Sequence, residues 1–135
     1  MRDITEKYGL NAGKLWNTLQ KYGPLTETTL LKSTRLSEED FYAAIGWLAR
    51  ENKIRKKGNK FELKDTNLTP TVGKNAGKVW NTLNNQCDVD ISSISKISKI
   101  KQTDAYAALG WLAREDKIRL SKNKTKTQPE KFSLK

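Results

Sequence analysis

The chain repeats itself at a fixed offset of 64 positions, and this repetition limits its possible folds more than any other feature. NAGKLWNTL at 11–19 returns as NAGKVWNTL at 75–83, and YAAIGWLARENKIR at 42–55 returns as YAALGWLAREDKIR at 106–119. The register holds without a gap between these blocks, and roughly half of the aligned positions are identical. Self-similarity at a fixed spacing is the mark of a duplicated structural unit. The chain is therefore predicted to contain two copies of one small domain.

The length suits two very small domains. The chain has 135 residues, of which 36% are hydrophobic, enough for one ordinary core or two small ones. The duplication favours two, with repeat one at 1–66 and repeat two at 67–135. Residues 64–74, KDTNLTPTVGK, join the repeats and are expected to be extended and mostly irregular, because they are rich in Thr, Asn, Pro and Gly. The opening ten residues align with this segment, which favours a non-helical start.

The first two helices of each repeat are predicted from caps and spacing. Asn11 and Asn75 are the predicted N-caps of helix one, since apolar residues follow at helical spacing. Helix two is predicted at about 26–33 in repeat one and about 90–97 in repeat two. A tight connection to the next helix follows in both repeats.

Helix three is the most clearly marked element. Ser37 is its predicted N-cap, with Asp40 three residues on, and the helix runs to about Glu51, or Glu115 in repeat two. One face of this helix is apolar at the spacing of a core stripe. The residues of that stripe are Phe41, Ile45 and Leu48.

A β-hairpin is predicted after each third helix. Apolar and polar residues alternate in 53–55 and 61–63, on either side of Gly58-Asn59, as expected for two strands and a tight turn. Residues 118–120 and 132–134 match this pattern in repeat two, where the connection between the strands is longer and polar.

Three helices followed by a basic hairpin are the element order of a winged helix-turn-helix domain. The blocks NAGxxW and GWLARE, followed by a charged hairpin, resemble a family of small winged helix-turn-helix proteins of bacteria and archaea. The resemblance implies a mainly α fold with small β, made of two tandem winged helix-turn-helix domains. It also implies nucleic-acid binding, which is the general expectation for this class. It carries over no catalytic residues, and a shared fold is weak evidence for a shared function.

Positive charge is concentrated in the hairpins, or wings. Residues 53–64 hold six basic residues and one acid, and residues 117–135 hold seven basic residues and one acid. Together they account for the whole net charge of +11. A solvated, loose loop is the alternative to a phosphate-binding role. The predicted nucleic-acid-binding residues of the wings are Arg55, Lys56, Lys57, Lys60, Arg119, Lys122, Lys124 and Lys126.

The second face of helix three is unusual for a DNA-reading helix, because it carries small and aromatic residues instead of hydrogen-bonding ones. We interpret it as an interface, either between the two repeats as a pseudo-dimer or with a partner protein. The residues are Tyr42, Ala43, Gly46, Trp47 and Arg50, with Tyr106, Ala107, Gly110, Trp111 and Arg114. Two alternatives stay open: the aromatic rings cover their own wing, or helix three reads bases, for which Lys101, Gln102 and Thr103 are the better candidates.

Several kinds of chemistry have little support in the sequence. The chain has no histidine and one cysteine, so no Ser-His or Cys-His pair can form and a zinc site is improbable. No phosphate-binding glycine loop, signal peptide or membrane-spanning run is present. We expect no enzyme activity, no metal or other cofactor, and a cytoplasmic location. Cys87 is expected to be a small buried hydrophobe, Trp16 and Trp80 packing residues, and Gly13 and Gly77 sites of close backbone approach.

Two functional hypotheses follow. The first is a nucleic-acid-binding protein, DNA-binding in particular and a transcriptional regulator or chromosome-associated protein, whose basic wings contact phosphates. The second is a protein-interaction adaptor that uses the Tyr/Ala/Gly/Trp face of helix three. DNA or RNA as the target, base specificity and oligomeric state stay undetermined at this stage.

Overall fold

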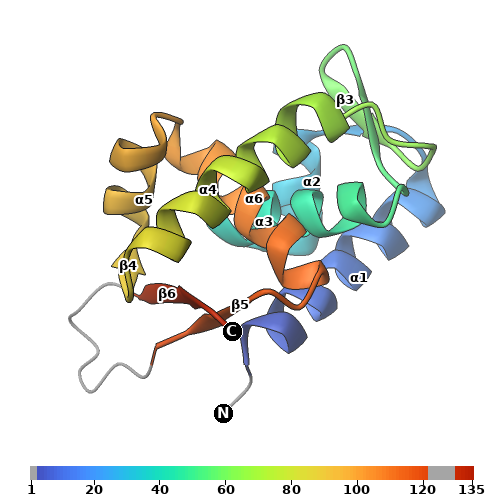
Figure 1. Ribbon diagram of the computed structural model, residues 1–135. Coiled ribbons are helices and arrows are strands. Elements are labelled where there is room, and N and C mark those ends of the chain that lie inside the picture. The colour runs from blue at the N-terminus through green and yellow to red at the C-terminus, as the bar shows by residue number, and fades with distance from the viewer. Residues whose placement is uncertain (1–2, 122–129) are drawn as a thin grey trace.

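The computed structural model describes residues 3–121 and 130–135 of the chain. Helices dominate both halves (Figure 1). Repeat one contains α1 (Ile4–Tyr22), α2 (Glu27–Thr34) and α3 (Glu38–Arg50). Repeat two contains the π-helix η1 (Thr69–Gly73), α4 (Lys74–Asn85), α5 (Ile91–Ser98) and α6 (Gln102–Arg114). The mainly α fold with small β sheets, in tandem, is confirmed.

Each repeat closes with a small antiparallel sheet. In repeat one, β3 (Lys60–Glu62) lies between β1 (Leu25–Thr26) and β2 (Arg55–Lys57). In repeat two, β6 (Lys131–Leu134) lies between β4 (Val89–Asp90) and β5 (Ile118–Leu120). The two hairpins were predicted, but the short strands that precede α2 and α5 were missed.

The start of helix one differs from the prediction in both repeats. Asp3 caps α1, and its carboxylate accepts a hydrogen bond from the Glu6 backbone N–H at 2.8 Å. Asn11 therefore lies inside α1, where it is buried, and not at its end. In repeat two η1 leads directly into α4 and takes Asn75 into the helix. The expected non-helical start and the expected N-caps were wrong, because the apolar spacing of helix one extends upstream of these asparagines.

The other helix boundaries follow the sequence closely. Ser37 caps α3 and accepts a hydrogen bond from the Asp40 N–H at 3.2 Å, as predicted. Thr26 and Asp90 cap α2 and α5, whose bounds differ from the prediction by one residue at each end. These caps turn the chain sharply before each helix and so fix the short connections of the three-helix unit.

Repeat one has its own core around α3. Phe41, Ile45 and Leu48 are buried, which confirms the predicted stripe. They pack with Leu15 of α1 and Leu30 of α2 in one cluster. The Phe61 ring meets the Phe41 ring edge-on, with centroids 5.7 Å apart, so the hairpin is attached to the helices by this cluster.

The lead-in segments of the repeats pack across to the opposite repeat. Ile4 and Tyr8 of α1 are buried within the core cluster of repeat two, among Val79, Leu109 and others. Figure 1 shows the start of α1 beside β5. In the reverse direction, Leu68, just before η1, packs against the core of repeat one. Each half of the chain therefore supplies part of the apolar surface that covers the other half.

Candidate nucleic-acid interface

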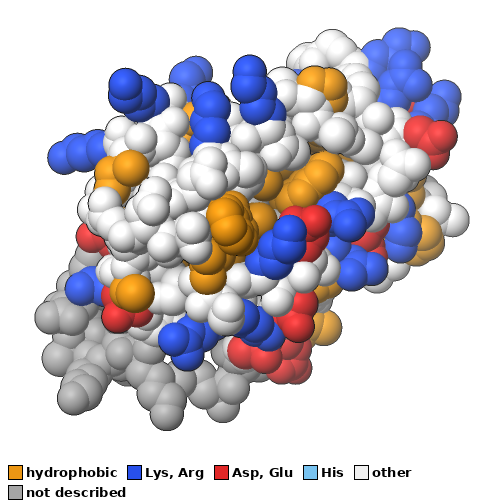
Figure 2. Space-filling view, in the orientation of Figure 1, with side chains coloured by type: hydrophobic (Ala, Val, Ile, Leu, Met, Phe, Trp, Pro, Cys, Tyr) orange, Lys and Arg blue, Asp and Glu red, His pale blue; other side chains and the backbone are white. Residues whose placement is uncertain are grey.

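The wing of repeat one presents exposed lysines, of which Lys56 also lies over the Phe61 ring, 5.6 Å from its centroid. Lys57 and Lys60 face each other across the turn, where Gly58 takes a φ of 62°, and Lys56 precedes them on β2. All three side chains are exposed, and none forms an ion pair with a described carboxylate. Lys53 and Lys64, by contrast, pair with Glu51 and Glu62 at 3.7 and 3.6 Å. Figure 2 shows Lys and Arg side chains gathered at the end of the molecule that carries β3.

The outer edge of this wing is closed by Asn67. The Lys56 backbone N–H donates to Asn67 Oδ1 at 3.0 Å, and Asn67 Nδ2 donates to the Lys56 carbonyl at 2.7 Å. These two bonds satisfy the open edge of β2 and hold the hairpin in place. Arg55 is half-buried, and its Nε is buried without a hydrogen-bond partner among the described residues. The exposed lysines are thus better placed to meet phosphate than Arg55.

The wing of repeat two is described only in part. Arg119 is exposed on β5, whereas Lys122, Lys124 and Lys126 lie outside the described residues. Asp88 ties the two strands together, since the Ser121 and Ser133 hydroxyls both donate to its carboxylate. These hydrogen bonds hold the pKa of Asp88 below its usual value. Asp88 therefore stays ionised and anchors the base of the wing.

The candidates for base reading lie in an acidic setting. Lys101 and Gln102 are exposed at the start of α6, and Thr103 is half-buried. Gln102 and Thr103 line one hollow together with Glu38 and Glu39 at the start of α3. Those carboxylates disfavour a phosphate backbone at this position.

Helices α3 and α6 cross through their small residues at the centre of the molecule. Ala43, Gly46, Ala107 and Gly110 are buried there. A Cβ placed on Gly46 would lie 1.7 Å from the Ala107 carbonyl oxygen, and one on Gly110 would lie 1.8 Å from the Ala43 carbonyl oxygen. The two backbones approach at distances that no side chain allows. The face that winged helices usually turn to the major groove is thus covered by the other repeat.

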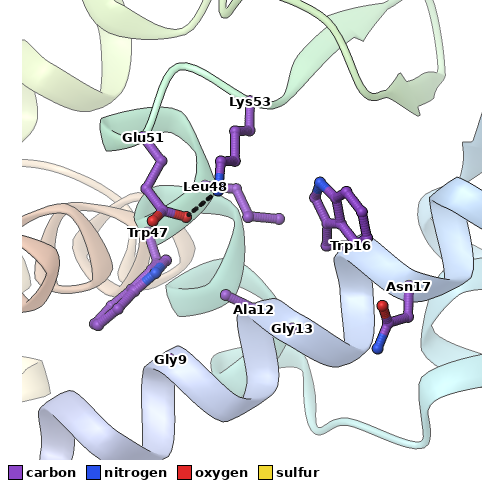
Figure 3. A pocket seen from close by; sticks show the side chains of 9 residues that line it. All are labelled: Gly9, Ala12, Gly13, Trp16, Asn17, Trp47, Leu48, Glu51 and Lys53. Atoms are coloured by element: carbon purple, nitrogen blue, oxygen red, sulfur yellow. Dashed lines mark ion pairs between the residues drawn. The ribbon is translucent and has the colours of Figure 1, made fainter.

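The tryptophans beside this crossing rest on glycines that the sequence analysis did not single out. A Cβ on Gly9 would lie 3.1 Å from the Trp47 ring, and a Cβ on Gly73 would lie 3.3 Å from the Trp111 ring. Figure 3 shows Trp47 close to this part of α1. Gly9 and Gly73 are themselves related by the 64-residue offset, which is the signal that reveals them.

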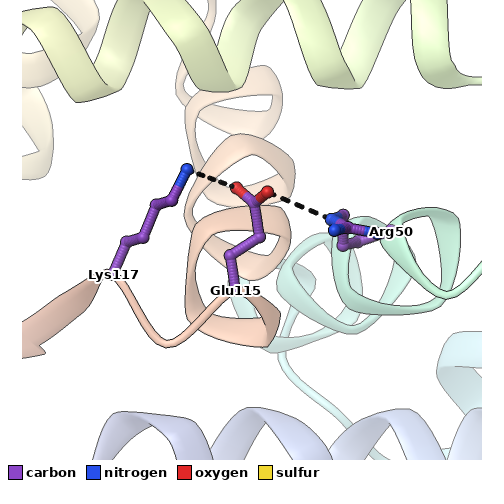
Figure 4. A network of polar contacts seen from close by, with 3 residues as sticks. All are labelled: Arg50, Glu115 and Lys117. Carbon is purple, nitrogen blue, oxygen red and sulfur yellow. Dashed lines mark hydrogen bonds and ion pairs between the residues drawn. The ribbon is translucent and has the colours of Figure 1, made fainter.

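Reciprocal ion pairs join the C-terminal ends of α3 and α6. Arg50 Nε lies 3.1 Å from Glu115 Oε2, and Arg114 Nε lies 3.0 Å from Glu51 Oε2. Figure 4 shows Glu115 held between Arg50 and Lys117. Arg50 also lies over the Trp111 ring and Arg114 over the Trp47 ring, 5.8 and 5.7 Å from the ring centroids.

The equivalent tyrosines of helix three have different partners. Tyr42 donates its hydroxyl to Glu27 within repeat one, whereas the carboxylate that acts on Tyr106 is Glu39 of the opposite repeat. Partial burial raises the pKa of both phenols, and the carboxylate beside each raises it further. Both rings therefore stay protonated.

Two minor predictions were wrong. A Cβ on Gly13 or Gly77 would meet nothing within 4 Å, so these glycines are not sites of close backbone approach. Cys87 is exposed, because α4 ends at Asn85 and the chain turns outside the core before β4 begins.

Comparison with protein families identifies the chain. A family model described as winged helix-turn-helix domain (DUF2582) matches residues 1–64 and again residues 63–128. The chain belongs to this family. Its double match confirms the tandem duplication, and the two matches meet where the sequence of the first wing ends. Winged helix-turn-helix domains indicate nucleic-acid binding in general and are typically non-enzymatic.

Two further comparisons, with curated proteins and with solved structures, found no related protein. Neither curated proteins nor solved structures gave a significant match to the chain. Within residues 3–121 and 130–135, no helix is long and apolar enough to span a bilayer. In the same part of the chain, no group of three or more Cys, Asp or Glu residues is arranged to hold a metal ion.

Proposed function

We propose that the protein binds duplex DNA through the phosphates, using the wings of its two repeats, and acts as a transcriptional regulator or chromosome-associated protein in the cytoplasm. The lysines of the wings neutralise backbone charge and read little base sequence. Helices α3 and α6 serve mainly to hold the repeats together as a covalent pseudo-dimer.

One observation carries this proposal: the small residues of the helix-three face are buried, whereas the wing lysines are exposed and form no ion pair with a described carboxylate. Ala43 and Gly46 lie against the opposite repeat and have no surface to offer a base. Lys56, Lys57 and Lys60 are exposed and unpaired with described carboxylates. A duplex gains the most electrostatic free energy where cations are not already neutralised.

The positions of the wings support contact at two separated points. The β2–β3 and β5–β6 sheets lie at opposite ends of the molecule (Figure 1). A pseudo-dimer of this kind would meet one duplex at two places or bridge two segments. In either mode, binding by one wing holds the other wing near DNA at a high effective concentration. The affinity of the whole protein then exceeds that of one wing alone.

A mobility-shift series tests the proposal. Duplex DNA, single-stranded DNA and RNA of equal length are titrated with the protein as salt rises, and the duplex affinity should fall steeply. Replacing Lys56, Lys57, Lys122 and Lys124 by Glu should abolish the shift. A control that changes Lys21, Lys32, Lys96 and Lys99 to Glu makes the same change of charge at the C-terminal ends of helices and should retain most binding. Salt-insensitive binding, or equal losses in both variants, would reject wing-centred contact.

The adaptor hypothesis requires a different state of the molecule. The small residues of the Tyr/Ala/Gly/Trp face already contact the opposite repeat, so a partner protein could reach them only if the repeats separated. Its test is a pulldown in which Trp47→Ala and Trp111→Ala abolish a specific partner and leave nucleic-acid affinity unchanged.

A further inference from the structure

Each repeat contains a hollow between its first and third helices, and the two hollows are lined by the same residues. In repeat one the cavity has a volume of about 350 Å³, and the equivalent cavity of repeat two has the same volume. The lining residues of the first are Gly9, Ala12, Gly13, Trp16, Asn17, Trp47, Leu48, Glu51 and Lys53. Every one of them is identical at the position 64 residues later.

This identity is most informative at exposed positions, where packing does not impose it. Some buried core positions differ between the repeats, since Leu15 becomes Val79 and Phe41 becomes Ala105, whereas others are unchanged, as Leu19 is in Leu83. Asn17 of the hollow is exposed, where packing imposes no such restriction, yet it is unchanged as Asn81. The lining of the hollow is therefore unchanged between the repeats even at a position that core packing does not restrict.

The glycine in the middle of helix one has no packing reason. Gly13 and Gly77 are exposed helix-interior residues, and a Cβ on either would enter open space. Glycine in a helix interior is about 1 kcal/mol less favourable than alanine. This unfavourable choice occurs twice and keeps the floor of each hollow open to the helix backbone. An incoming ligand explains it, whereas the protein's own contacts do not.

The walls of each hollow are indole rings, one of which is fixed in place. Figure 3 shows Trp16 and Trp47 on opposite sides of the glycine stretch of α1, with the Glu51–Lys53 ion pair along the rim. Trp47 lies against Gly9 and beneath the Arg114 guanidinium, which Glu51 in turn holds. Because the Trp47 side chain is already fixed, it loses little conformational entropy when a ligand binds. Since Arg114 comes from repeat two, each hollow is complete only when the repeats are packed.

We infer that the hollows are twin binding sites for a heteroaromatic ring of nucleobase size that carries a nearby phosphate. Indole walls favour a flat ring by stacking, and the Asn17 amide can hydrogen-bond its polar edge. The exposed Lys14 beside Gly13 forms no ion pair with a described carboxylate and supplies a cation for a phosphate, whereas Lys53 at the rim is already paired with Glu51. This inference rests on the proposed nucleic-acid function. The ring can come from an unpaired base of a strand or from a free nucleotide.

The tryptophans of the chain give a direct readout. The sequence has four, and all of them line the two hollows. The full-length protein is titrated with AMP, with oligo(dT) of about ten nucleotides and with a blunt duplex of the same length, while tryptophan emission is followed. Saturable quenching by oligo(dT) alone identifies an unpaired strand as the source, and quenching by AMP identifies a free nucleotide; each supports the inference. Unchanged emission with both overturns it.

Filling the hollows separates binding from structure. Gly13→Leu with Gly77→Leu should preserve or raise the melting temperature, since a Cβ at either site enters open space and leucine is the better helix former. The same pair should weaken binding of the quenching ligand about tenfold or more, because the leucine side chains extend into the hollows. The milder pair Gly13→Ala with Gly77→Ala should weaken it less. Gln20→Leu with Asn84→Leu adds the same side chains at exposed helix positions outside the hollows and should bind normally. Equal affinity of filled and unfilled proteins would overturn the inference.

The wing variants distinguish this inference from the proposed function. The Glu substitutions at Lys56, Lys57, Lys122 and Lys124 should abolish the duplex mobility shift and leave quenching by AMP intact. A duplex mobility shift without quenching by either ligand would support phosphate binding by the wings and reject ligand binding in the hollows. Quenching without any duplex shift would support ligand binding in the hollows and reject DNA binding by the wings.

Discussion

Repeat one and repeat two solve the same packing problem with different interiors and the same contact surfaces. Phe41 in the first core is replaced by Ala105 in the second, and Leu30 by Ile94. At the crossing of α3 and α6, by contrast, Ala43 and Gly46 have identical counterparts. Hydrophobic cores tolerate exchange when total volume can be recovered nearby, whereas backbone contact tolerates none. The comparison teaches that the small residues of the crossing are repeated without change, whereas parts of the core are repacked with side chains of different size.

The lead-in segments show how the volume is recovered. The regular start of α1 buries Ile4 and Tyr8 in the core of repeat two, in the cluster that also holds the small Ala105. Its counterpart before α4 is the π-helix η1, which follows the half-buried Leu68. Repeat two therefore depends on repeat one for buried apolar surface more than the reverse.

The largest effect is expected at the crossing. Gly46→Ala with Gly110→Ala should lower the free energy of unfolding by about 3 kcal/mol or more, because each new Cβ would overlap a backbone carbonyl that cannot move alone. Urea denaturation followed by circular dichroism measures this loss. The matched pair Gly13→Ala with Gly77→Ala makes the same change in helices with open space, and should stabilise the protein by about 0.5–1 kcal/mol per site. Equal effects of the two pairs would contradict the close backbone approach.

A smaller effect tests the unequal dependence of the repeats. Ile4→Ala should cost about 2–3 kcal/mol, since the side chain is 2% exposed within the core of repeat two. Leu68→Ala should cost less, because that side chain is only partly buried. Hydrogen exchange resolved by residue locates the damage: Ile4→Ala should loosen α4 and α6 before α2. If Ile4→Ala increased hydrogen exchange only within repeat one, the packing of Ile4 in the core of repeat two would be contradicted.

Much of the fold was predictable from local signals. Ser37 predicts the start of α3 because its hydroxyl can accept a hydrogen bond from the Asp40 N–H, and Gly58 predicts the turn of the first wing. Because the chain is duplicated, a pattern that occurs in both repeats supports the same helix or strand twice. The start of helix one was predicted wrongly because Asn11 is a residue type common at N-caps and is followed by apolar residues at helical spacing. The residue that caps α1 is Asp3, eight positions earlier.

The candidate site was less predictable, because it depends on contacts between distant segments. Small residues on helix three indicated an interface, but Arg114 above Trp47 follows only from the placement of the repeats. Gly13 was noted for the right reason, its poor helix propensity, and given the wrong consequence. The open space beside it is visible only in three dimensions. Trp16, assigned to packing, is half-buried and lines the hollow as well.

The smallest effect concerns the two tyrosines whose partners differ. Tyr42→Phe removes a hydrogen bond within repeat one and should cost about 0.5–1.5 kcal/mol near neutral pH, whereas Tyr106→Phe removes the hydroxyl on which Glu39 of the opposite repeat acts. Tyr42→Phe should cost more, because its partner Glu27 is half-buried while Glu39 is exposed to water.

The pH dependence sharpens this last comparison. The pKa values of both phenols are raised in the folded chain, so the unfolded chain releases these protons first. The free energy of unfolding should therefore fall as pH rises above about 10, the ordinary tyrosine pKa. Each phenylalanine variant removes one ionising group and should lose less stability than the parent between pH 9 and pH 11, as measured by urea denaturation. If the alkaline loss of stability is the same in the parent and the double variant, neither Tyr42 nor Tyr106 is responsible for it. The effect then belongs to Tyr8, whose pKa is raised chiefly by burial and further by nearby carboxylates.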